Sequence, residues 1–264
     1  MNIINKNNEV IINYKELIKK NDDEYIAIDD INIIKLAYDY KLEIKDFFYC
    51  YELDYHKETI DLINQISDYA VNSYMISKKT YLNLINKENS VGLFAIIKIK
   101  YNYDLKELKE LNKDYLIICD GIEIPGNLGT IYRTSDSAKV DALVITNLVT
   151  HPYNYKNTIA SRGCNIIMPT TICNIDELIE YLIDNEYDVY LGEPKLGLSY
   201  KDYDYQGKIA IVVGNERFGI DKKWYEVNND HFKKVFIPMY GSNNSLNVSV
   251  AASILIYEAS TKRF

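Results

Sequence analysis

Hydrophobic positions in the first hundred residues recur at two different intervals, which separates short strands from amphipathic helices. Strand-like runs rich in β-branched and aromatic residues occupy residues 25–28, 46–50, 74–76 and 91–99. Helical spacing predicts helices over residues 30–40, 57–70 and 78–85, and Asp30 is a suitable N-cap for the first of them. These alternating elements predict a small α/β domain.

From residue 115 onward the alternation of strands and helices is clearer. The predicted strands span residues 115–119, 142–146, 165–168, 188–191, 208–213 and 234–237. The predicted helices span residues 127–138, 175–185 and 246–260. Strands interleaved with helices predict a mainly parallel sheet that is covered on both faces. In such sheets ligands bind beyond the carboxyl ends of the strands, where the loops gather.

The charged segment 102–114 separates the two patterns. It carries Leu105, Leu108 and Leu111 at helical spacing, so we expect it to form a structured connection between two domains. A tether rich in Gly, Ser or Pro is absent from the sequence. We place the boundary near residue 108, which gives predicted domains at residues 1–108 and 109–264.

The composition and net charge of the chain limit how it can bind a nucleic acid. A hydrophobic fraction of 47% and a charged fraction of 26% are ordinary for globular domains. The net charge is −8, with 14 Lys and Arg against 18 Asp and Glu in residues 1–108 and 16 against 20 in the remainder. This acidic balance argues against a protein whose whole surface attracts phosphate, so an RNA partner must meet a local basic patch.

The cysteines and the apolar runs indicate the cellular setting. Cys50, Cys119, Cys164 and Cys173 form no Cys-x-x-Cys pair, and no histidine lies at zinc-ligand spacing from them. The sequence shows no leader-like segment, and no apolar run approaches the ~20 residues of a membrane-spanning helix. We expect a reduced, cytoplasmic protein with no membrane association and no metal.

Three loops rich in Gly, Asn, Ser and Pro follow predicted strands closely, at residues 124–133, 214–219 and 237–249. If the sheet is parallel, all three can meet at one edge. In the first loop, Asn127 is a suitable helix cap, and the guanidinium of Arg133 suits an RNA phosphate. Alternatively, Asn127 only caps the helix and Arg133 only pairs with a surface carboxylate. The G-x-G-x-x-G and GK[ST] patterns are both absent, which disfavours a dinucleotide or nucleoside triphosphate site.

The second and third loops place polar groups beside apolar elements. Glu216 follows an apolar strand inside a turn bounded by glycines, where its burial would need a partner, although it could simply brace the turn. The third loop leads into residues 246–257, which are apolar on almost every face and predict a buried helix with Ser245 as its N-cap. Asn247 and Ser249 then need polar partners, and a bound ligand is one possibility.

The three loops, in their order along the chain, resemble the signature motifs of the SpoU (TrmH-like) RNA 2′-O-ribose methyltransferases. The segments are P-G-N-L-G-T-I-Y-R-T at 125–134, I-V-V-G-N-E at 211–216 with Gly219, and I-P-M at 237–239 followed by S-L-N-V-S at 245–249. The resemblance covers roughly residues 115–264. Three ordered motifs make it far more specific than any one motif alone.

This resemblance implies a SPOUT-type α/β fold with a C-terminal trefoil knot, a homodimer formed through this domain, and S-adenosyl-L-methionine as cofactor. Residues before about 100 resemble, more loosely, the L30e-like domain that binds the RNA substrate in many family members. By the same resemblance, Arg133 is the catalytic arginine, Asn127 and Glu216 support it and the substrate, and Ser245 and Asn247 complete the site. The implied cofactor-binding residues are Leu191, Gly192, Glu193, Gly214, Ile237, Met239, Ser245 and Leu246.

The sequence departs from the family pattern at three positions. Ile124 stands where many members have an acidic or polar residue, Lys139 where a glycine usually closes the first helix, and Ile159 where an arginine is usual. These departures concern substrate contacts more than catalysis. In the implied reaction, Arg133 accepts the proton of the ribose hydroxyl or organises the group that does.

The predicted function is therefore methyl transfer to a ribose 2′-hydroxyl of ribosomal or transfer RNA. A SPOUT enzyme that methylates a base nitrogen is the alternative within enzymes. A catalytically silent RNA-binding or assembly factor is the alternative from another class, although intact Asn127, Arg133, Glu216 and Asn247 count against it. A nucleotide-binding oxidoreductase lacks its phosphate-binding fingerprint.

Overall fold

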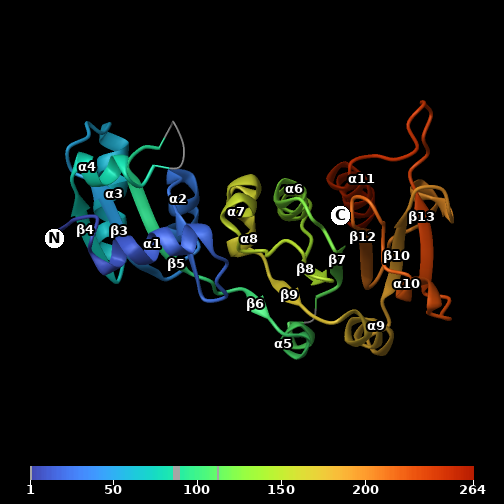
Figure 1. Cartoon of the computed structure of the whole chain (residues 1–264). Coiled ribbons are helices and arrows are strands. Elements are labelled where there is room, and N and C mark those ends of the chain that lie inside the picture. Colours follow the sequence, from blue (N-terminus) through green and yellow to red (C-terminus); the bar gives the residue numbers. More distant parts are fainter. Residues whose placement is uncertain (1, 86–89, 112) are drawn as a thin grey trace. The chain divides into compact units, whose positions relative to one another are not determined.

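The computed structural model describes residues 2–85, 90–111 and 113–264, which divide into two compact units (Figure 1). The first unit comprises Met1–Lys100 with Tyr153–Ile167, and the second comprises Tyr101–Pro152 with Met168–Phe264. The division falls near residue 100 rather than 108, because the predicted connection packs into the second unit. Its Leu108 is buried in the core of that unit, and Leu105 lies against the same core.

The first unit is built on a mixed sheet of order β1-β4-β3-β5-β2, in which β3 and β2 each run antiparallel to β5. Its strands are β1 (Asn2–Ile4), β2 (Tyr25–Ile28), β3 (Ile44–Cys50), β4 (Asn72–Ile76) and β5 (Leu93–Lys98). Its helices are α1 (Glu9–Lys19), α2 (Ile31–Asp39), α3 (Lys57–Tyr69), α4 (Lys78–Leu82), α7 (Tyr155–Ser161) and α8 (Cys164–Ile167). This unit contains the predicted alternation of strands and helices, with β1, α1, α7 and α8 as additional elements.

Local sequence explains how these elements begin and pack. Asp30 caps α2 as expected, because its carboxylate accepts hydrogen bonds from the N–H groups of Asn32 and Ile33. One face of the sheet buries Phe48 and Phe94, whose rings stack with their centroids 5.2 Å apart. Tyr14 of α1 packs edge-on against both rings. Alternation along β3 and β5 thus supplies the apolar face that α1 covers.

The prediction of a strand at residues 165–168 is wrong, because these residues belong to the short helix α8 and its end. The amide of Asn165 donates to the Thr158 hydroxyl and its oxygen accepts from the Ser161 hydroxyl, so both bonds join α8 to α7. The strand follows instead as β9 (Thr170–Ile172), after Pro169 has ended the helix. The apolar run was too short to distinguish a strand from a buried helix.

The second unit is built on a parallel sheet of order β11-β13-β10-β12-β7-β8-β9-β6, as expected from the alternation of elements. Besides β9, its strands are β6 (Asn102–Tyr103), β7 (Tyr115–Asp120), β8 (Ala142–Thr146), β10 (Asp188–Glu193), β11 (Leu198–Ser199), β12 (Ile209–Gly214) and β13 (Phe232–Phe236). Its helices are α5 (Leu105–Glu110), α6 (Pro125–Ser137), α9 (Ile175–Asp184), α10 (Lys223–Glu226) and α11 (Val248–Arg263), with a 3₁₀ turn at Tyr200–Asp202.

Helices cover both faces of this sheet. On one face, side chains of α5, α9 and α10 join those of the central strands in one core that includes Leu178 and Trp224. On the other face, α6 and α11 pack against each other, and α11 also packs against β12. The Tyr115 hydroxyl of β7 donates to the Ile256 carbonyl of α11, and the Ser260 hydroxyl of α11 donates to the Ala138 carbonyl. The result is the three-layer arrangement expected for a parallel sheet.

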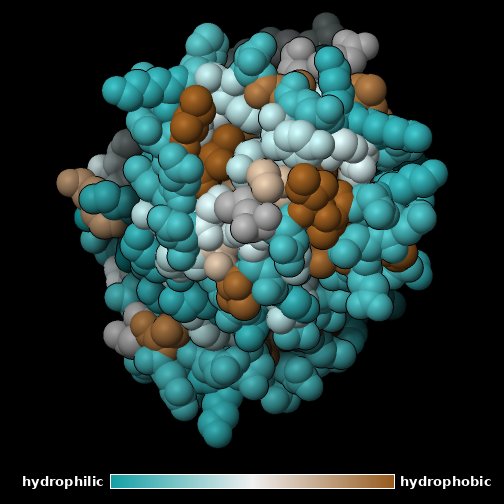
Figure 2. Space-filling model, turned by 90° about the vertical axis from the view of Figure 1, so that its left-hand side faces the viewer, coloured by the Kyte–Doolittle hydropathy of each residue, from teal (hydrophilic) through white to brown (hydrophobic). Residues whose placement is uncertain are grey.

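Apolar residues along α11 do not all face the protein. The helix spans Val248–Arg263 rather than residues 246–260, and Val250 and Tyr257 are about half exposed. Figure 2 shows a mainly hydrophilic surface with small, separate hydrophobic patches. In the first unit, Ile3 and Val71 are among the exposed hydrophobic residues. Within the described ranges, no helix is long and apolar enough to cross a bilayer.

A buried carboxylate fixes the loops that follow β7, β8 and β12. Asp120 is 2% exposed and ends β7. Its Oδ1 accepts hydrogen bonds from the Thr146 hydroxyl and the Asn147 amide, and its Oδ2 accepts from the Asp221 N–H and the Trp224 indole. A buried acceptor with four donors is costly to remove, because each donor would lose its partner away from water.

We expect Asp120→Ala to lower the free energy of unfolding of the second unit by about 3 kcal/mol. The reason is that four donors, several of them buried, would be left unpaired. Urea denaturation followed by the fluorescence of Trp224, the single tryptophan, measures the midpoint. The exposed Asp230→Ala variant serves as control and should change the same quantity by less than about 0.5 kcal/mol. Equal midpoints for the two variants would contradict the role given to Asp120.

Candidate active site

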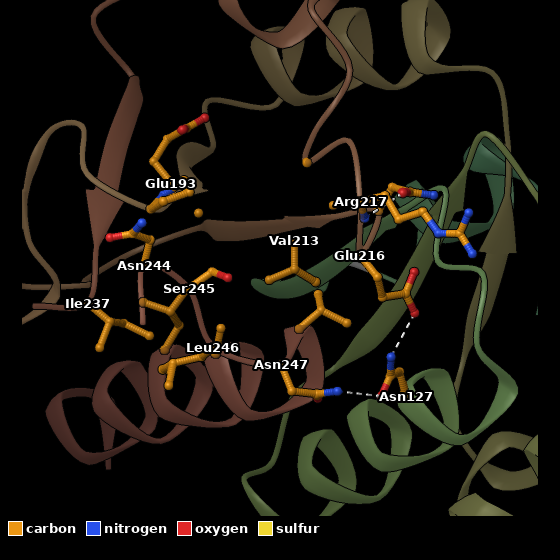
Figure 3. A pocket seen from close by; sticks show the side chains of 18 of the residues that line it. Asn127, Glu193, Val213, Glu216, Arg217, Ile237, Asn244, Ser245, Leu246 and Asn247 are labelled. Atoms are coloured by element: carbon orange, nitrogen blue, oxygen red, sulfur yellow. Dashed lines mark hydrogen bonds between the residues drawn. The ribbon is translucent and has the colours of Figure 1, made fainter. Parts of the chain in front are cut away.

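A pocket of about 610 Å³ opens at the carboxyl edge of the second sheet (Figure 3). The ends of β10, β12 and β13 form one wall, and the three Gly- and Asn-rich loops form the rest. This is where ligands bind in open parallel sheets, so the expectation that the three loops meet at one edge is confirmed. The residues singled out by sequence that line the pocket are Asn127, Gly192, Glu193, Gly214, Glu216, Ile237, Met239, Ser245, Leu246 and Asn247.

Two glycines bring the backbone to the surface of the pocket. A Cβ atom added to Gly214 would lie 2.2 Å from the Gly219 carbonyl carbon, and one added to Gly192 would lie 2.9 Å from the Val212 oxygen. Residues 215 and 219 close this turn through a pair of backbone hydrogen bonds of 2.9 and 3.0 Å. Only glycine therefore fits at these strand ends, and peptide groups rather than side chains form this wall.

The pocket has two chemically different ends, which Figure 3 shows side by side. Ile237 and Leu246 form one end, here called the apolar end, with Asn244 and Ser245 beside them. Val213 lies between the two ends. Glu193 also borders this end, where burial raises the pKa of its carboxyl group while Lys234 acts in the opposite direction. A ligand with a flat apolar part and several hydrogen-bonding edges fits such a wall of backbone and aliphatic groups.

Glu216, Asn127 and Asn247 form the polar end of the pocket through a continuous chain of hydrogen bonds. The Asn127 amide donates to Glu216 Oε1 at 2.7 Å, and the Asn247 amide donates to Asn127 Oδ1 at 3.1 Å. The Asn247 oxygen accepts from the N–H and the hydroxyl of Ser249, at 3.0 and 2.6 Å. One residue from each of the three loops is thus tied to the next.

Backbone donors hold the carboxylate of Glu216. Its Oε2 accepts from the Glu123 N–H at 2.9 Å, and its Oε1 accepts from the Ile124 N–H at 3.1 Å. Burial acts to raise the pKa of Glu216, but the hydrogen bonds from Glu123, Asn127 and Ile124 outweigh it and hold the pKa below its usual value. Glu216 is therefore an ionised hydrogen-bond acceptor at neutral pH, and its lowered basicity disfavours a role as proton acceptor.

The interpretation of Asn127 as a helix cap is wrong. Helix α6 begins at Pro125 with Ile124 as its N-cap, so Asn127 lies within the first turn and its side chain turns to Glu216. Proline is favoured at the first helical position because it needs no donor there and its φ is already helical. The negative Glu216 carboxylate beside this helix start replaces a capping side chain and suits the positive end of the helix dipole.

The prediction of Ser245 as the cap of the last helix is also wrong. Asn247 caps α11, because its side-chain oxygen accepts the Ser249 N–H and the helix begins at Val248. Ser245 remains in the loop and lines the pocket. The partners expected for Asn247 and Ser249 are thus found within the protein, on each other and on Asn127.

Two residues singled out by sequence lie outside the pocket. Leu191 is 2% exposed and packs in the core of the second unit, so only its neighbours Gly192 and Glu193 reach the pocket. Arg133 lies on the exposed side of α6 and does not border the pocket. Conversely, Arg217 borders the pocket although sequence reasoning passed over it. The position of Arg217 directly after Glu216 is the feature of the sequence that could have identified it as a pocket residue.

The fold and the site together define an α/β protein that binds a ligand at the carboxyl edge of a parallel sheet. A family model described as the SpoU rRNA methylase family matches residues 114–257. The chain therefore belongs to the SpoU rRNA methylase family.

Relatives of known name agree with this assignment. The chain is 28% identical over 188 residues to the 23S rRNA (guanosine(2553)-2′-O)-methyltransferase RlmP of Bacillus subtilis, covering 71% of this chain and 72% of that one. It is 32% identical over 211 residues to a Staphylococcus aureus protein named for the TrmH family of tRNA/rRNA methyltransferases, covering 76% and 84%.

Solved structures share the fold. The AdoMet-bound rRNA methyltransferase from Sinorhizobium meliloti aligns with a TM-score of 0.82 at 18% identity, covering 97% of this chain and 96% of that one. The SpoU methyltransferase AviRb from Streptomyces viridochromogenes, in complex with AdoMet, aligns with a TM-score of 0.80 at 19% identity, covering 97% and 99%. The expected α/β fold with a parallel sheet is confirmed.

We expect the stability difference between the wild type and Glu216→Gln to depend on pH. The difference is largest at neutral pH, because the ionised carboxylate accepts hydrogen bonds that a neutral amide satisfies less well. It shrinks as the pH falls below the usual glutamate value of 4.5 and through the lowered pKa of Glu216, since protonation then weakens the same bonds in the wild type.

Denaturation midpoints of both proteins across this pH range provide the measurement. The variant Glu110→Gln at an exposed position of α5 serves as control. A gap between the wild type and Glu216→Gln that stays constant with pH would contradict the charged role of Glu216.

Proposed function

We propose that this protein is an S-adenosyl-L-methionine-dependent methyltransferase that acts on a ribose 2′-hydroxyl of ribosomal or transfer RNA. The observation that carries the proposal is the chain of hydrogen bonds from Glu216 through Asn127 to Asn247, at one end of a glycine-walled pocket. It brings together the three loops whose motifs resemble those of the SpoU methyltransferases. The names of the relatives support the same activity on RNA.

The pocket fits S-adenosyl-L-methionine. Peptide groups near Gly192, Gly214 and Leu246 can hydrogen-bond the adenine and the methionine part, while Val213 and Ile237 can pack against the adenine ring. A Cβ atom at Gly214 would collide with the backbone of Gly219 and Ile220, so only glycine fits there and the peptide group faces the pocket without a side chain. When bound, the cofactor supplies an activated methyl group from its sulfonium centre. The chain itself must then hold the ribose in line and remove its proton.

The polar end of the pocket suits the ribose. Asn127 and Glu216 are fixed by their mutual hydrogen bond, so they can position groups without first reorganising. The hydroxyl oxygen of the ribose attacks the methyl carbon, and its proton must leave as the new bond forms. We assign the removal of that proton to Arg133, which accepts it when its side chain is in the neutral guanidine form in the RNA complex, or otherwise orients the group that accepts it. The lowered pKa of Glu216 makes this carboxylate the positioning residue rather than the base.

We further propose that two copies of the chain form a homodimer through the second unit. Val250 and Tyr257 are 47% and 48% exposed and lie seven residues apart on α11, so they share one helix face. Helix α6, which carries Arg133, packs directly beside α11. Docking on this face would cover the apolar residues and let Arg133 of one copy serve the site of the other.

The family resemblance supports three further proposals. These are a trefoil knot in the C-terminal segment, an L30e-like first unit that binds the RNA substrate, and a cytoplasmic location. Neither half carries a basic excess, so RNA contact depends on local cations.

We expect Arg133→Ala to reduce methyl transfer at least a hundred-fold while leaving the affinity for S-adenosyl-L-methionine within about two-fold, because Arg133 acts on the ribose proton and not on the cofactor. Methylation is measured by mapping 2′-O-methyl nucleosides in RNA from cells that lack the gene, that carry the wild-type gene or that carry the variant. Cofactor affinity is measured by calorimetry. Lys109→Ala, an exposed cation of α5, serves as the control.

Several results would overturn these assignments. Full methylation by Arg133→Ala would refute the role of that residue. A methylated base in the digested product would favour the base-nitrogen alternative. Absence of cofactor binding to the wild type would favour a silent RNA-binding factor.

We expect Tyr257→Glu to convert the dimer into a monomer, because a charge would replace an apolar ring in the buried contact. Sedimentation equilibrium should then show half the mass of the wild type. Ile183→Glu, at a 40% exposed position of α9, should leave the dimer intact. A wild type that sediments as a monomer, or a Tyr257→Glu variant that stays dimeric, would argue against this interface.

A further inference from the structure

The turn at residues 215–219, which follows β12, exposes an aromatic ring beside the pocket. Phe218 is 82% exposed, although its neighbours Arg217 and Gly219 both line the pocket. A phenylalanine this exposed gives up the free energy that burial of its ring would provide. Single exposed hydrophobic residues are common, but this one lies on the rim of the candidate active site.

The backbone that carries Phe218 is held firmly. The side-chain oxygen of Asn215 accepts hydrogen bonds from the N–H groups of Arg217 and Phe218, at 2.9 and 3.1 Å. The Asn215 amide donates to the Gly121 carbonyl at 2.8 Å, and residues 215 and 219 close the turn. These hydrogen bonds hold the base of the turn, and Phe218 at its tip is exposed to solvent.

Arg217 places a positive charge next to this ring. Its side chain is 76% exposed and lies 3.7 Å from the Glu123 carboxylate, which itself accepts a hydrogen bond from Asn215. An exposed ion pair at this distance contributes little stability, so a phosphate can replace the carboxylate as partner. Figure 3 shows the guanidinium extending on the side of Glu216 and Asn127, away from Ile237 and Ser245.

We propose that Arg217 and Phe218 bind the RNA segment that flanks the methylated ribose. Phe218 stacks on an unpaired base, and Arg217 contacts a neighbouring phosphate. Aromatic rings and guanidinium groups are the side chains that recognise single-stranded RNA, through stacking and charge-assisted hydrogen bonds. This inference rests on the proposed function, and it adds a recognition element at the polar end of the pocket that is separate from the cofactor end.

The first test separates RNA binding from catalysis. Phe218→Ala should raise the KM for the RNA substrate about ten-fold with little change in kcat, because stacking contributes alike to ground state and transition state. Phe218→Tyr should restore the wild-type KM. Arg217→Ala should weaken binding of a single-stranded oligoadenylate and reduce the slope of log affinity against log salt by about one. S-adenosyl-L-methionine affinity should remain unchanged in both Phe218 variants, because Phe218 does not line the pocket.

The second test detects stacking directly. The native Trp224 is fully buried, so Phe218→Trp adds the one exposed indole of the chain. Base stacking should quench the fluorescence of this indole when oligoadenylate is added. The control is Phe264→Trp, which places an indole at a 74% exposed position beyond the far end of the 16-residue α11. Val248, at the start of α11, lines the pocket, and Phe264 lies about 24 Å along the helix from it. The fluorescence of an indole at position 264 should therefore not respond to oligoadenylate.

The outcomes distinguish this inference from the proposed function. If the wild type binds the cofactor and methylates RNA, but Phe218→Ala keeps the wild-type KM and Phe218→Trp is not quenched, the recognition role is overturned. If both effects appear, the role is supported. If the wild type neither binds the cofactor nor methylates RNA, the proposed function itself fails, and oligoadenylate quenching then shows an RNA-binding turn without methyl transfer.

Discussion

The carboxylate of Glu216 is the group on which the rest of the site depends. It accepts two backbone N–H groups at the start of α6 and the amide of Asn127, and Asn127 in turn accepts the amide of Asn247 at the start of α11. The ionised carboxylate of Glu216, which follows β12, therefore links the start of α6 directly and the start of α11 through Asn127. Because the hydrogen bonds from these donors lower the pKa of Glu216, the charge that organises the loops persists at neutral pH.

That arrangement works only because the two helices are themselves held in place. The Thr134 and Ser253 hydroxyls meet at 3.0 Å between α6 and α11. At the other end of α11, Lys262 donates to the carbonyls of Lys201 and Tyr203, and Arg263 donates to that of Gly207. These contacts fix the C-terminal end of α11 to the loop after β11, and the rigid helix carries that constraint to the pocket. The first turn of α11 can then present Asn247 and the Leu246 backbone together.

The two ends of the pocket divide the proposed work. The apolar end uses backbone and aliphatic groups, which suit the adenine and methionine parts of the proposed cofactor. The polar end uses fixed amide and carboxylate groups, which suits a ribose that must be held still while its hydroxyl reacts. Two cations lie at the margin of this site, Arg217 on the rim of the pocket and Arg133 on the exposed side of α6. The negative net charge of the chain confines RNA attraction to such local positions.

The sequence by itself determined the α/β class, most of the strands and helices, and the three loops that build the site. Hydrophobic periodicity and runs of Gly, Asn and Ser are local properties, and the chain obeys them. It did not determine that residues 165–168 form a helix, that Glu216 replaces Asn127 at the start of α6, or that Asn247 rather than Ser245 caps α11. Those choices depend on partners distant in the sequence, such as Glu216 lying 89 positions from Asn127. Only the tertiary structure brings such groups within hydrogen-bonding distance, and it alone decided that Leu191 turns into the core while Arg133 faces solvent.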